Sequence, residues 1–282
     1  MLKALLVSIR PKQWYKNLLL FVGIIFSANF LNAYMWLEAV LAFVFFCLLS
    51  SGEYLINDIV DRARDRRHPL KRKRPIASGE LKVSYALSFA VILFLIALLG
   101  SYFAVSMPFF IFAASYVLLV LLYSLVFKRL VIADVLIISV GFVLRAVAGC
   151  VAIGVIISPW LIVCTLLLAL LLVFGKRRGE LASVGERTAT KITGLSSYSV
   201  VMLDQLIGIS AAAAIVSYLM YSFFMGNYYM MLTAPSVVYG LFRYLFLVHQ
   251  ENFGGELERI FKDKPTLINL AIWVLLVVIV LY

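Results

Sequence analysis

Long apolar runs separated by short polar segments make up the chain from residue 18 onward. Each run is about 20 residues long, which at 1.5 Å per residue is enough to cross a hydrocarbon core roughly 30 Å thick. The runs are continuous, whereas the strands of a membrane barrel alternate apolar and polar residues. The pattern predicts an all-α, polytopic membrane bundle of about nine transmembrane helices. The predicted spans are 18–36, 37–57, 83–104, 107–127, 130–153, 158–175, 204–224, 228–248 and 266–282.

The distribution of positive charge supports this count. If the N-terminus is cytoplasmic, the segments 58–82, 128–129, 176–203 and 249–265 are also cytoplasmic, and together with the N-terminal residues 1–17 they hold nearly all of the 25 Lys and Arg residues. The opposite connections contain none. Such asymmetry is what the positive-inside rule predicts, so we expect a plasma-membrane protein whose polar face is cytoplasmic. Arg145 and Arg243 are exceptions, because each lies within a predicted span.

Composition agrees with a membrane protein throughout. The chain is 64% hydrophobic and 14% charged, whereas soluble domains are about half apolar and about a quarter charged. We therefore expect one integral membrane domain over residues 1–282, with a basic, interfacial lead-in before the first span. Membrane lipids are expected around it and no nucleic-acid partner is expected, while a homo-oligomer is left open.

The strongest chemical signal is an acidic cluster at the end of the second predicted span. Asn57, Asp58, Asp61 and Asp65 fall within about a quarter of a helix circumference, with Glu53 one turn earlier near the edge. A solvated helix end with local ion pairs is the structural alternative. Oxygen ligands without His or Cys suit Mg²⁺, whose coordination is commonly completed by water and substrate phosphate. The cluster predicts a magnesium site for a diphosphate.

A basic segment follows, which its prolines and a glycine prevent from continuing as a helix. It includes Lys71, Arg72, Lys73 and Arg74. Alone, such a run is typical of membrane anchoring or of anionic-lipid binding. Beside the acidic cluster it indicates a loop that folds back, so that carboxylates, metal and polyanion neutralise one another.

Two further groups of residues extend this picture. Tyr123 and Lys128 close the fourth span, where interfacial anchoring is the alternative reading. Arg145 lies midway along the fifth span, where an arginine is costly unless it faces a carboxylate or a polar cavity. After the sixth span come Lys176, Arg177, Glu180 and Glu186, which form either local ion pairs or a second wall of the polyanion site.

The acidic spacing, Asn57-Asp58-x-x-Asp61-x-x-x-Asp65, resembles the first aspartate motif of the UbiA superfamily of intramembrane prenyltransferases. The resemblance covers essentially the whole chain. Four longer strings are similar to the polyprenyl-phosphate phosphoribosyltransferase branch. They are RPKQWYKN from Arg10, NDIVDRARDRRHPLKRKRPIASG from Asn57, GFVLRAVAG from Gly141 and GKRRGE from Gly175.

The resemblance implies transfer of 5-phosphoribosyl from phosphoribosyl diphosphate to a polyprenyl phosphate such as decaprenyl phosphate, for cell-wall biosynthesis. Asp58 and Asp61 would be catalytic through Mg²⁺, which Asn57 and Asp65 would help to bind. The substrate-binding residues implied are Asn57, Lys71, Arg72, Arg74, Tyr123, Lys128, Arg145, Lys176, Arg177, Glu180 and Glu186.

One departure from the superfamily pattern bears on the donor. Typical prenyltransferase members carry a second aspartate-rich motif after the sixth span, where this chain has KRRGELASVGER. The added cations, Lys176 and Arg177, are those expected for a 5-phosphate. An ordinary prenyltransferase, acting on an aromatic or glycerol-phosphate acceptor, is the alternative enzyme. A transporter for a phosphorylated solute is disfavoured, because basic residues are missing from every predicted outer loop.

Overall fold

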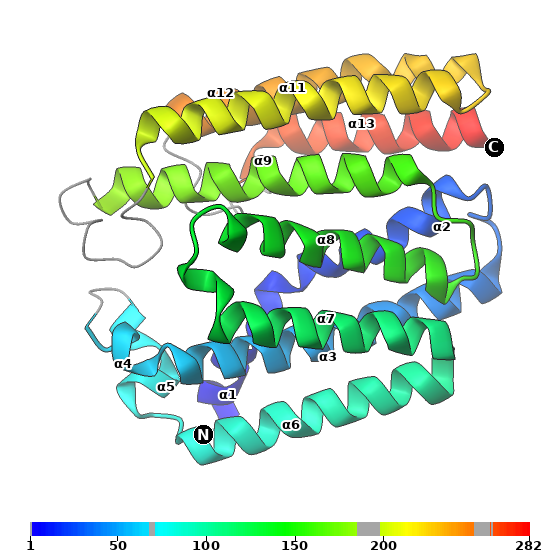
Figure 1. Ribbon diagram of the computed structural model, residues 1–282. Coiled ribbons are helices and arrows are strands. Elements are labelled where there is room, and N and C mark those ends of the chain that lie inside the picture. The colour runs from blue at the N-terminus through cyan, green and yellow to red at the C-terminus, as the bar shows by residue number, and fades with distance from the viewer. Residues whose placement is uncertain (1, 68–70, 185–197, 251–259, 261) are drawn as a thin grey trace. The chain divides into compact units, whose positions relative to one another are not determined.

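The computed structural model describes residues 2–67, 71–184, 198–250, 260 and 262–282, and every regular element in these ranges is helical. The chain divides into two compact units, which are described separately (Figure 1). Unit 1 comprises residues 1–128 and 144–157, and unit 2 comprises residues 129–143 and 158–282.

Unit 1 begins with a short helix and a 3₁₀ segment, and it contains three long apolar helices. Its elements are α1 (Leu2–Ile9), the 3₁₀ helix η1 (Pro11–Phe21), α2 (Val22–Phe26), α3 (Ala33–Val60), α4 (Arg62–Asp65), the 3₁₀ turn η2 (Lys71–Lys73), α5 (Pro75–Ser78), α6 (Val83–Gly100), the π-helical turn η3 (Ser101–Val105), α7 (Met107–Leu125) and the end of α8 (Ala133–Ala152). The 3₁₀ turn η4 (Phe127–Arg129) lies at the boundary with unit 2.

Large side chains from several helices fill the core of unit 1. Phe46 of α3 packs with Phe109 and Tyr116 of α7, and Leu20 of η1 lies in the same cluster. Gly149 of α8 permits this packing, because a Cβ there would lie 2.1 Å from the backbone oxygen of Leu20. The close approach brings η1 against α8.

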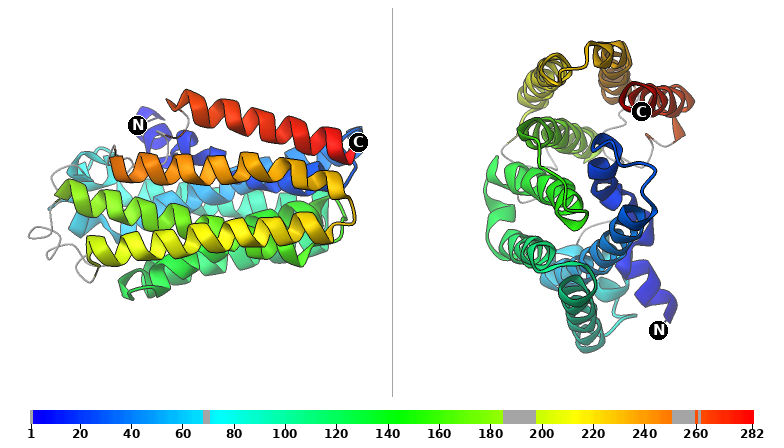
Figure 2. Two further views of the ribbon diagram at one scale, coloured as in Figure 1. Left: turned by 90° about the horizontal axis from the view of Figure 1, so that it is seen from above. Right: turned by 90° about the vertical axis from the view of Figure 1, so that its right-hand side faces the viewer.

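Unit 2 contains the start of α8 and four further long helices. They are α9 (Pro159–Val184), α11 (Val200–Phe224), α12 (Ala234–Gln250) and α13 (Lys264–Leu281), with the 3₁₀ segment η5 (Tyr228–Thr233) leading into α12. Within this unit α12 lies beside both α11 and α13 (Figure 2). Side-chain caps begin two of these helices, because Ser199 accepts from Met202 N and Asp263 accepts from Thr266 N.

Within the described residues, eight helical segments are long and apolar enough to cross a membrane, and these correspond to eight of the nine predicted spans. The first predicted span, 18–36, differs. It is divided by a turn in which Ala28 has a φ of 57°, and Asn32 caps α3 by accepting from Tyr34 N and Met35 N. These asparagine-rich turn residues end α2, and α3 begins after them at Ala33.

Helix α9 also differs from its predicted span, because it continues nine residues beyond 175, to Val184. Pairs between Glu180 and both Lys176 and Arg177 lie on this extension. Residues spaced three and four apart share a helix face, so these pairs favour continued helix.

Candidate active site

The acidic cluster lies at the end of α3 and in the short helix α4. Helical hydrogen bonds carry the chain through the junction, from Asp61 N to Asn57 O at 2.9 Å and from Asp65 N to Asp61 O at 2.8 Å. Asp58, Asp61 and Asp65 are only 2%, 7% and 1% exposed. Buried carboxylates are stable only when cations or hydrogen-bond donors compensate them.

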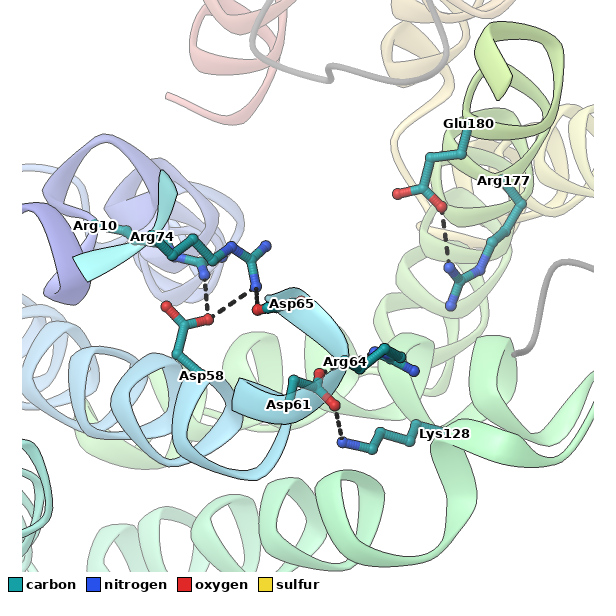
Figure 3. A network of polar contacts seen from close by, with 9 residues as sticks. All are labelled: Arg10, Asp58, Asp61, Arg64, Asp65, Arg74, Lys128, Arg177 and Glu180. Carbon is teal, nitrogen blue, oxygen red and sulfur yellow. Dashed lines mark hydrogen bonds and ion pairs between the residues drawn. The ribbon is translucent and has the colours of Figure 1, made fainter. Parts of the chain in front are cut away.

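Arg74, from the basic loop, compensates two of these carboxylates. Its Nη1 lies 3.0 Å from Asp58 Oδ1 and 2.7 Å from Asp65 Oδ2 (Figure 3). Arg74 is extended and precedes Pro75, which occupies the first turn of α5, and Gly79 ends that helix with a φ of 91°. The basic loop therefore lies beside the acidic cluster, with Pro75 starting a short helix.

Arg10 is a second partner of Asp58. Its Nη2 lies 2.5 Å from Asp58 Oδ1, and its guanidinium carbon lies 4.9 Å from the centre of the Tyr54 ring. This contact joins residues 48 positions apart. Sequence reasoning placed Arg10 only in the basic lead-in, although it heads one of the strings that carry the resemblance.

Asp61 faces a different pair of cations. Lys128, in η4, places its Nζ 2.6 Å from Asp61 Oδ1, and Arg64 Nη2 lies 3.0 Å from Asp61 Oδ2. The Lys128 side chain is itself largely buried. The predicted residues Asp61 and Lys128 are therefore in contact, and Arg64 forms a local pair with Asp61, three positions away.

The donor atoms of the acidic cluster fit Mg²⁺. They are all oxygens, and the buried atoms Asn57 Oδ1 and Asp65 Oδ1 have no hydrogen-bond partner among the described residues. A hard cation with its water ligands satisfies such atoms. Within the ranges that the structure describes, no three His, Cys, Asp or Glu side chains are already gathered as a metal site. The fit therefore concerns ligand chemistry, and no coordination geometry follows from it.

The remaining predicted residues of unit 1 lie in varied positions. Lys71 and Arg72 lie on η2, where Arg72 is exposed, and Tyr123 is partly buried on α7. Arg145 is buried, and its Nε donates to Asn17 Oδ1 at 2.8 Å.

Arg145 belongs to a buried polar network inside the span. Its Nη2 donates to Tyr116 Oη at 2.5 Å, Tyr116 in turn donates to Glu53, and Glu53 Oε2 lies 4.0 Å from Arg145 Nη2. The arginine therefore has the nearby carboxylate that its depth in the span requires. Sequence reasoning assigned no role to Asn17, the last residue of the RPKQWYKN string, or to Tyr116, a neutral residue within an apolar span.

Unit 2 carries a second charged cluster, around Arg177 of α9. Arg177 Nη2 lies 2.7 Å from Asp134 Oδ2, and Arg177 Nη1 lies 3.0 Å from Glu180 Oε2. Lys176 Nζ lies 3.8 Å from the other Glu180 oxygen. Tyr198 Oη donates to Asp134 Oδ1 and accepts from Ile132 N. The predicted residues Lys176, Arg177 and Glu180 are thus together, whereas Glu186 lies outside the described residues.

Protonation of Tyr198 supports this arrangement. Burial raises the pKa of Tyr198, and the carboxylate of Asp134 adds to the effect. The phenol therefore stays protonated at neutral pH and remains a hydrogen-bond donor to Asp134.

The fold and the two charged clusters define a class of membrane protein. The chain belongs to the UbiA prenyltransferase family, whose profile matches residues 17–275. It is an integral membrane protein of that family, with the long apolar helices described above.

Two curated relatives and one solved structure place the chain more closely. It is 32% identical to decaprenyl-phosphate phosphoribosyltransferase of Corynebacterium glutamicum over 98% of this chain and 86% of the relative. It is 35% identical to the protein of the same name from Mycolicibacterium smegmatis, over 79% of this chain and 71% of the relative. A UbiA homologue from Archaeoglobus fulgidus, solved with DMAPP and Mg²⁺, has a TM-score of 0.75 at 20% identity, covering 98% of each chain. This last likeness concerns the fold.

Proposed function

We propose that this chain transfers 5-phosphoribosyl from phosphoribosyl diphosphate to a polyprenyl phosphate, with Mg²⁺ as cofactor and diphosphate as the second product. The observation that carries the proposal is the match over most of the chain to two relatives named decaprenyl-phosphate phosphoribosyltransferase. The buried carboxylates and the cations around them support it independently, because they suit a polyanionic substrate.

The reaction forms one bond and breaks one bond at C1 of the ribose. An oxygen of the lipid phosphate attacks C1, and the bond from C1 to the diphosphate oxygen breaks, with its electron pair leaving on diphosphate. Because the attacking phosphate monoester is already an anion, no general base has to remove a proton. Attack from the face opposite the leaving group inverts the configuration at C1. Catalysis then depends on charge neutralisation and on alignment.

The chain's own residues have two tasks in this reaction. Asp58 and Asp61, with Asn57 and Asp65, would bind Mg²⁺, which neutralises charge on the departing diphosphate. Lys71, Arg72, Arg74, Tyr123 and Lys128 would donate hydrogen bonds to phosphoryl oxygens. Arg74 and Lys128 are well suited to this task, because they already lie against the carboxylates.

Cations outside the acidic cluster would distinguish phosphoribosyl diphosphate from a prenyl diphosphate. In unit 2, Lys176 and Arg177 are our predicted ligands of the 5-phosphate, a group that prenyl diphosphates lack. Asp134 and Glu180 would position the Arg177 guanidinium by accepting its hydrogen bonds. Arg145 would contribute to substrate binding through the polar network around it.

We place the active site at the cytoplasmic face of the plasma membrane, on the strength of the charge asymmetry. A single cysteine at Ser78, which is exposed at the end of α5, tests this placement once Cys47, Cys150 and Cys164 have been replaced. An impermeant thiol reagent should label it only from the cytoplasmic side. Labelling from the outside would contradict the placement.

The second candidate is prenyl transfer from a prenyl diphosphate to an aromatic or glycerol-phosphate acceptor. The observation in its favour is the A. fulgidus structure of the same fold, which was solved with DMAPP and Mg²⁺. The acidic cluster serves either donor equally well. The choice between them therefore depends on the donor assay.

The donor assay uses purified protein, phosphoribosyl diphosphate labelled in the ribose, polyprenyl phosphate and Mg²⁺. We expect label in the lipid phase, loss of transfer on chelation of the metal, and recovery when Mg²⁺ is restored. Transfer of a prenyl group from geranylgeranyl diphosphate, with no incorporation of ribose label, would favour the second candidate.

A further inference from the structure

A cavity of about 230 Å³ lies in unit 1 beside Asp58, on the side of helix α1. Arg10, Lys73 and Arg74 line it together with Asp58, so these charged residues give the lining a formal charge of +2. Lys73 is exposed, and no described carboxylate lies within ion-pair distance of its ammonium group. The charge balance of the lining favours an anionic ligand.

The two arginines of the cavity are already oriented. Both donate to Asp58 Oδ1 (Figure 3). The guanidinium of Arg10 also lies over the ring of Tyr54. Arg10 adopts a φ of 50° at the junction between α1 and η1, where the chain changes direction. Side chains that are fixed before binding lose less entropy when a ligand arrives, so this lining is preorganised for an anion.

The cavity also has an apolar part, contributed by Val7 of α1 and by Pro75. Helix α1 exposes Leu2, Leu6 and Val7 while it buries Ala4 and Ser8 against the rest of unit 1. An amphipathic helix with exposed aliphatic residues and nearby lysines is typical of segments that lie in the membrane interface. The cavity therefore combines a cationic wall with a short apolar surface on α1 and at Pro75.

The size and the mixed lining favour one of the ligands that the proposed reaction offers. The volume is several times the roughly 30 Å³ occupied by one water molecule in the liquid, so a phosphate group and the first carbons attached to it fit. Phosphoribosyl diphosphate is polar throughout and gains nothing from Val7 or Pro75. A phosphate monoester on a hydrocarbon chain matches both walls.

We infer that this cavity binds the phosphate group of the polyprenyl phosphate acceptor, with Lys73 and Arg10 as its ligands and Val7 against the first carbons of the lipid. The inference rests on the proposed function for the identity of the acceptor. It adds two substrate ligands that sequence reasoning did not assign. Because Asp58 lines the cavity, the acceptor phosphate binds next to a carboxylate of the acidic cluster.

The test compares Lys73→Gln with Lys82→Gln, a matched control at an exposed lysine that begins α6 and does not line the cavity. Binding of labelled polyprenyl phosphate is measured in phosphatidylcholine nanodiscs, and KM is measured for both substrates. Lys73→Gln should weaken lipid phosphate binding about tenfold, as expected for one lost charge-assisted hydrogen bond. The KM for phosphoribosyl diphosphate should stay at the wild-type value, and the control should match wild type throughout.

A second variant, Val7→Trp, fills the cavity without changing its charge. Val7 is 55% exposed on α1, so the larger side chain is compatible with folding. It should reproduce the selective loss of lipid phosphate binding. Val7 lies on α1, outside the basic loop. If Lys73→Gln weakened lipid phosphate binding only by disturbing that loop, Val7→Trp would bind lipid phosphate like wild type.

Three results would overturn the inference. The first is a selective increase in the KM for phosphoribosyl diphosphate, which would assign the cavity to the donor. The second is displacement of the labelled polyprenyl phosphate when phosphatidylglycerol is added to the nanodiscs, which would make the cavity an anionic-lipid anchor. The third is wild-type lipid phosphate binding in both variants. Failure of the proposed function is distinguishable, because wild-type protein would then transfer no ribose while the binding measurement still reports on the cavity.

Discussion

The two charged clusters use similar residues in opposite ways. In unit 1 the carboxylates Asp58 and Asp65 are buried, and Arg10 and Arg74 reach them from partly exposed positions. In unit 2 the cation Arg177 is the central group, and Asp134 and Glu180 accept its hydrogen bonds. The first arrangement presents oxygen ligands, two of which have atoms without described partners, and so suits a metal. The second fixes the direction of a guanidinium, which suits recognition of an anion.

The largest effect should come from the first cluster. Asp58→Asn keeps the size of the side chain and removes its charge, and we expect turnover to fall roughly a thousandfold, because metal-assisted charge stabilisation contributes several kcal/mol. The measurement is kcat with saturating substrates. Glu80→Gln, an exposed acidic position just after the basic loop, is the control. Normal turnover in Asp58→Asn, with Mg²⁺ still required, would remove this carboxylate from the site.

The second cluster should control affinity for the donor. Lys176→Ala combined with Arg177→Ala should raise the KM for phosphoribosyl diphosphate much more than that for lipid phosphate. Each lost charge-assisted bond costs about 1.5–3 kcal/mol. Arg177→Ala also leaves the buried carboxylate of Asp134 without its arginine, which affects folding. The double variant Asp134→Asn with Arg177→Gln removes both charges, so a change in its KM for phosphoribosyl diphosphate does not come from an unpaired carboxylate. Equal changes in both KM values would contradict the assignment of the 5-phosphate.

A smaller effect should distinguish the two carboxylates that bind Arg177. Asp134 is 1% exposed, so Asp134→Asn should lower the free energy of unfolding by about 2 kcal/mol. The Glu180 side chain is 30% exposed, and Glu180→Gln should change stability by less than about 1 kcal/mol. Thermal unfolding of both variants in the same detergent measures the difference. The reverse order would mean that Glu180 is the principal anchor of Arg177.

A loss of stability smaller than that of Asp134→Asn should come from Tyr198, and it should depend on pH. Tyr198→Phe removes the hydrogen bond to Asp134 and should cost about 1 kcal/mol at neutral pH. Folding raises the pKa of Tyr198 above that of tyrosine in the unfolded chain, which is about 10. The contribution of Tyr198 to stability is therefore fully present below about pH 10 and is lost as the pH rises further. The difference in Tm between wild type and Tyr198→Phe should therefore shrink above pH 10. A difference that grew with pH would contradict this sign.

Local sequence patterns predict the helices and contacts that depend on residues close together in the sequence. Apolar runs predicted eight of the spans, and the local ion pairs considered after the sixth span are present, as the contact between Arg177 and Glu180 shows. The turn that ends α2 was missed, because its asparagines lie within an otherwise apolar stretch.

Long-range contacts were not predictable from spacing. Arg10 pairs with Asp58 across 48 positions, and this contact depends on the left-handed backbone at Arg10 and on the close packing of η1. Asn17 and Tyr116 join the Arg145 network from other elements of unit 1. The cavity beside Asp58 is likewise formed by α1 and the basic loop, which are far apart in sequence.

Identification of the transferred group tests the central claim most directly. Wild-type protein is given phosphoribosyl diphosphate, geranylgeranyl diphosphate, polyprenyl phosphate and Mg²⁺ together with a quinone precursor and glycerol phosphate, and the lipid products are identified by mass spectrometry. We expect one new lipid, a polyprenyl phosphate that has gained a phosphoribosyl group, and none when Asp58→Asn replaces wild type. A prenylated quinone precursor or glycerol phosphate, with the polyprenyl phosphate unchanged, would contradict it.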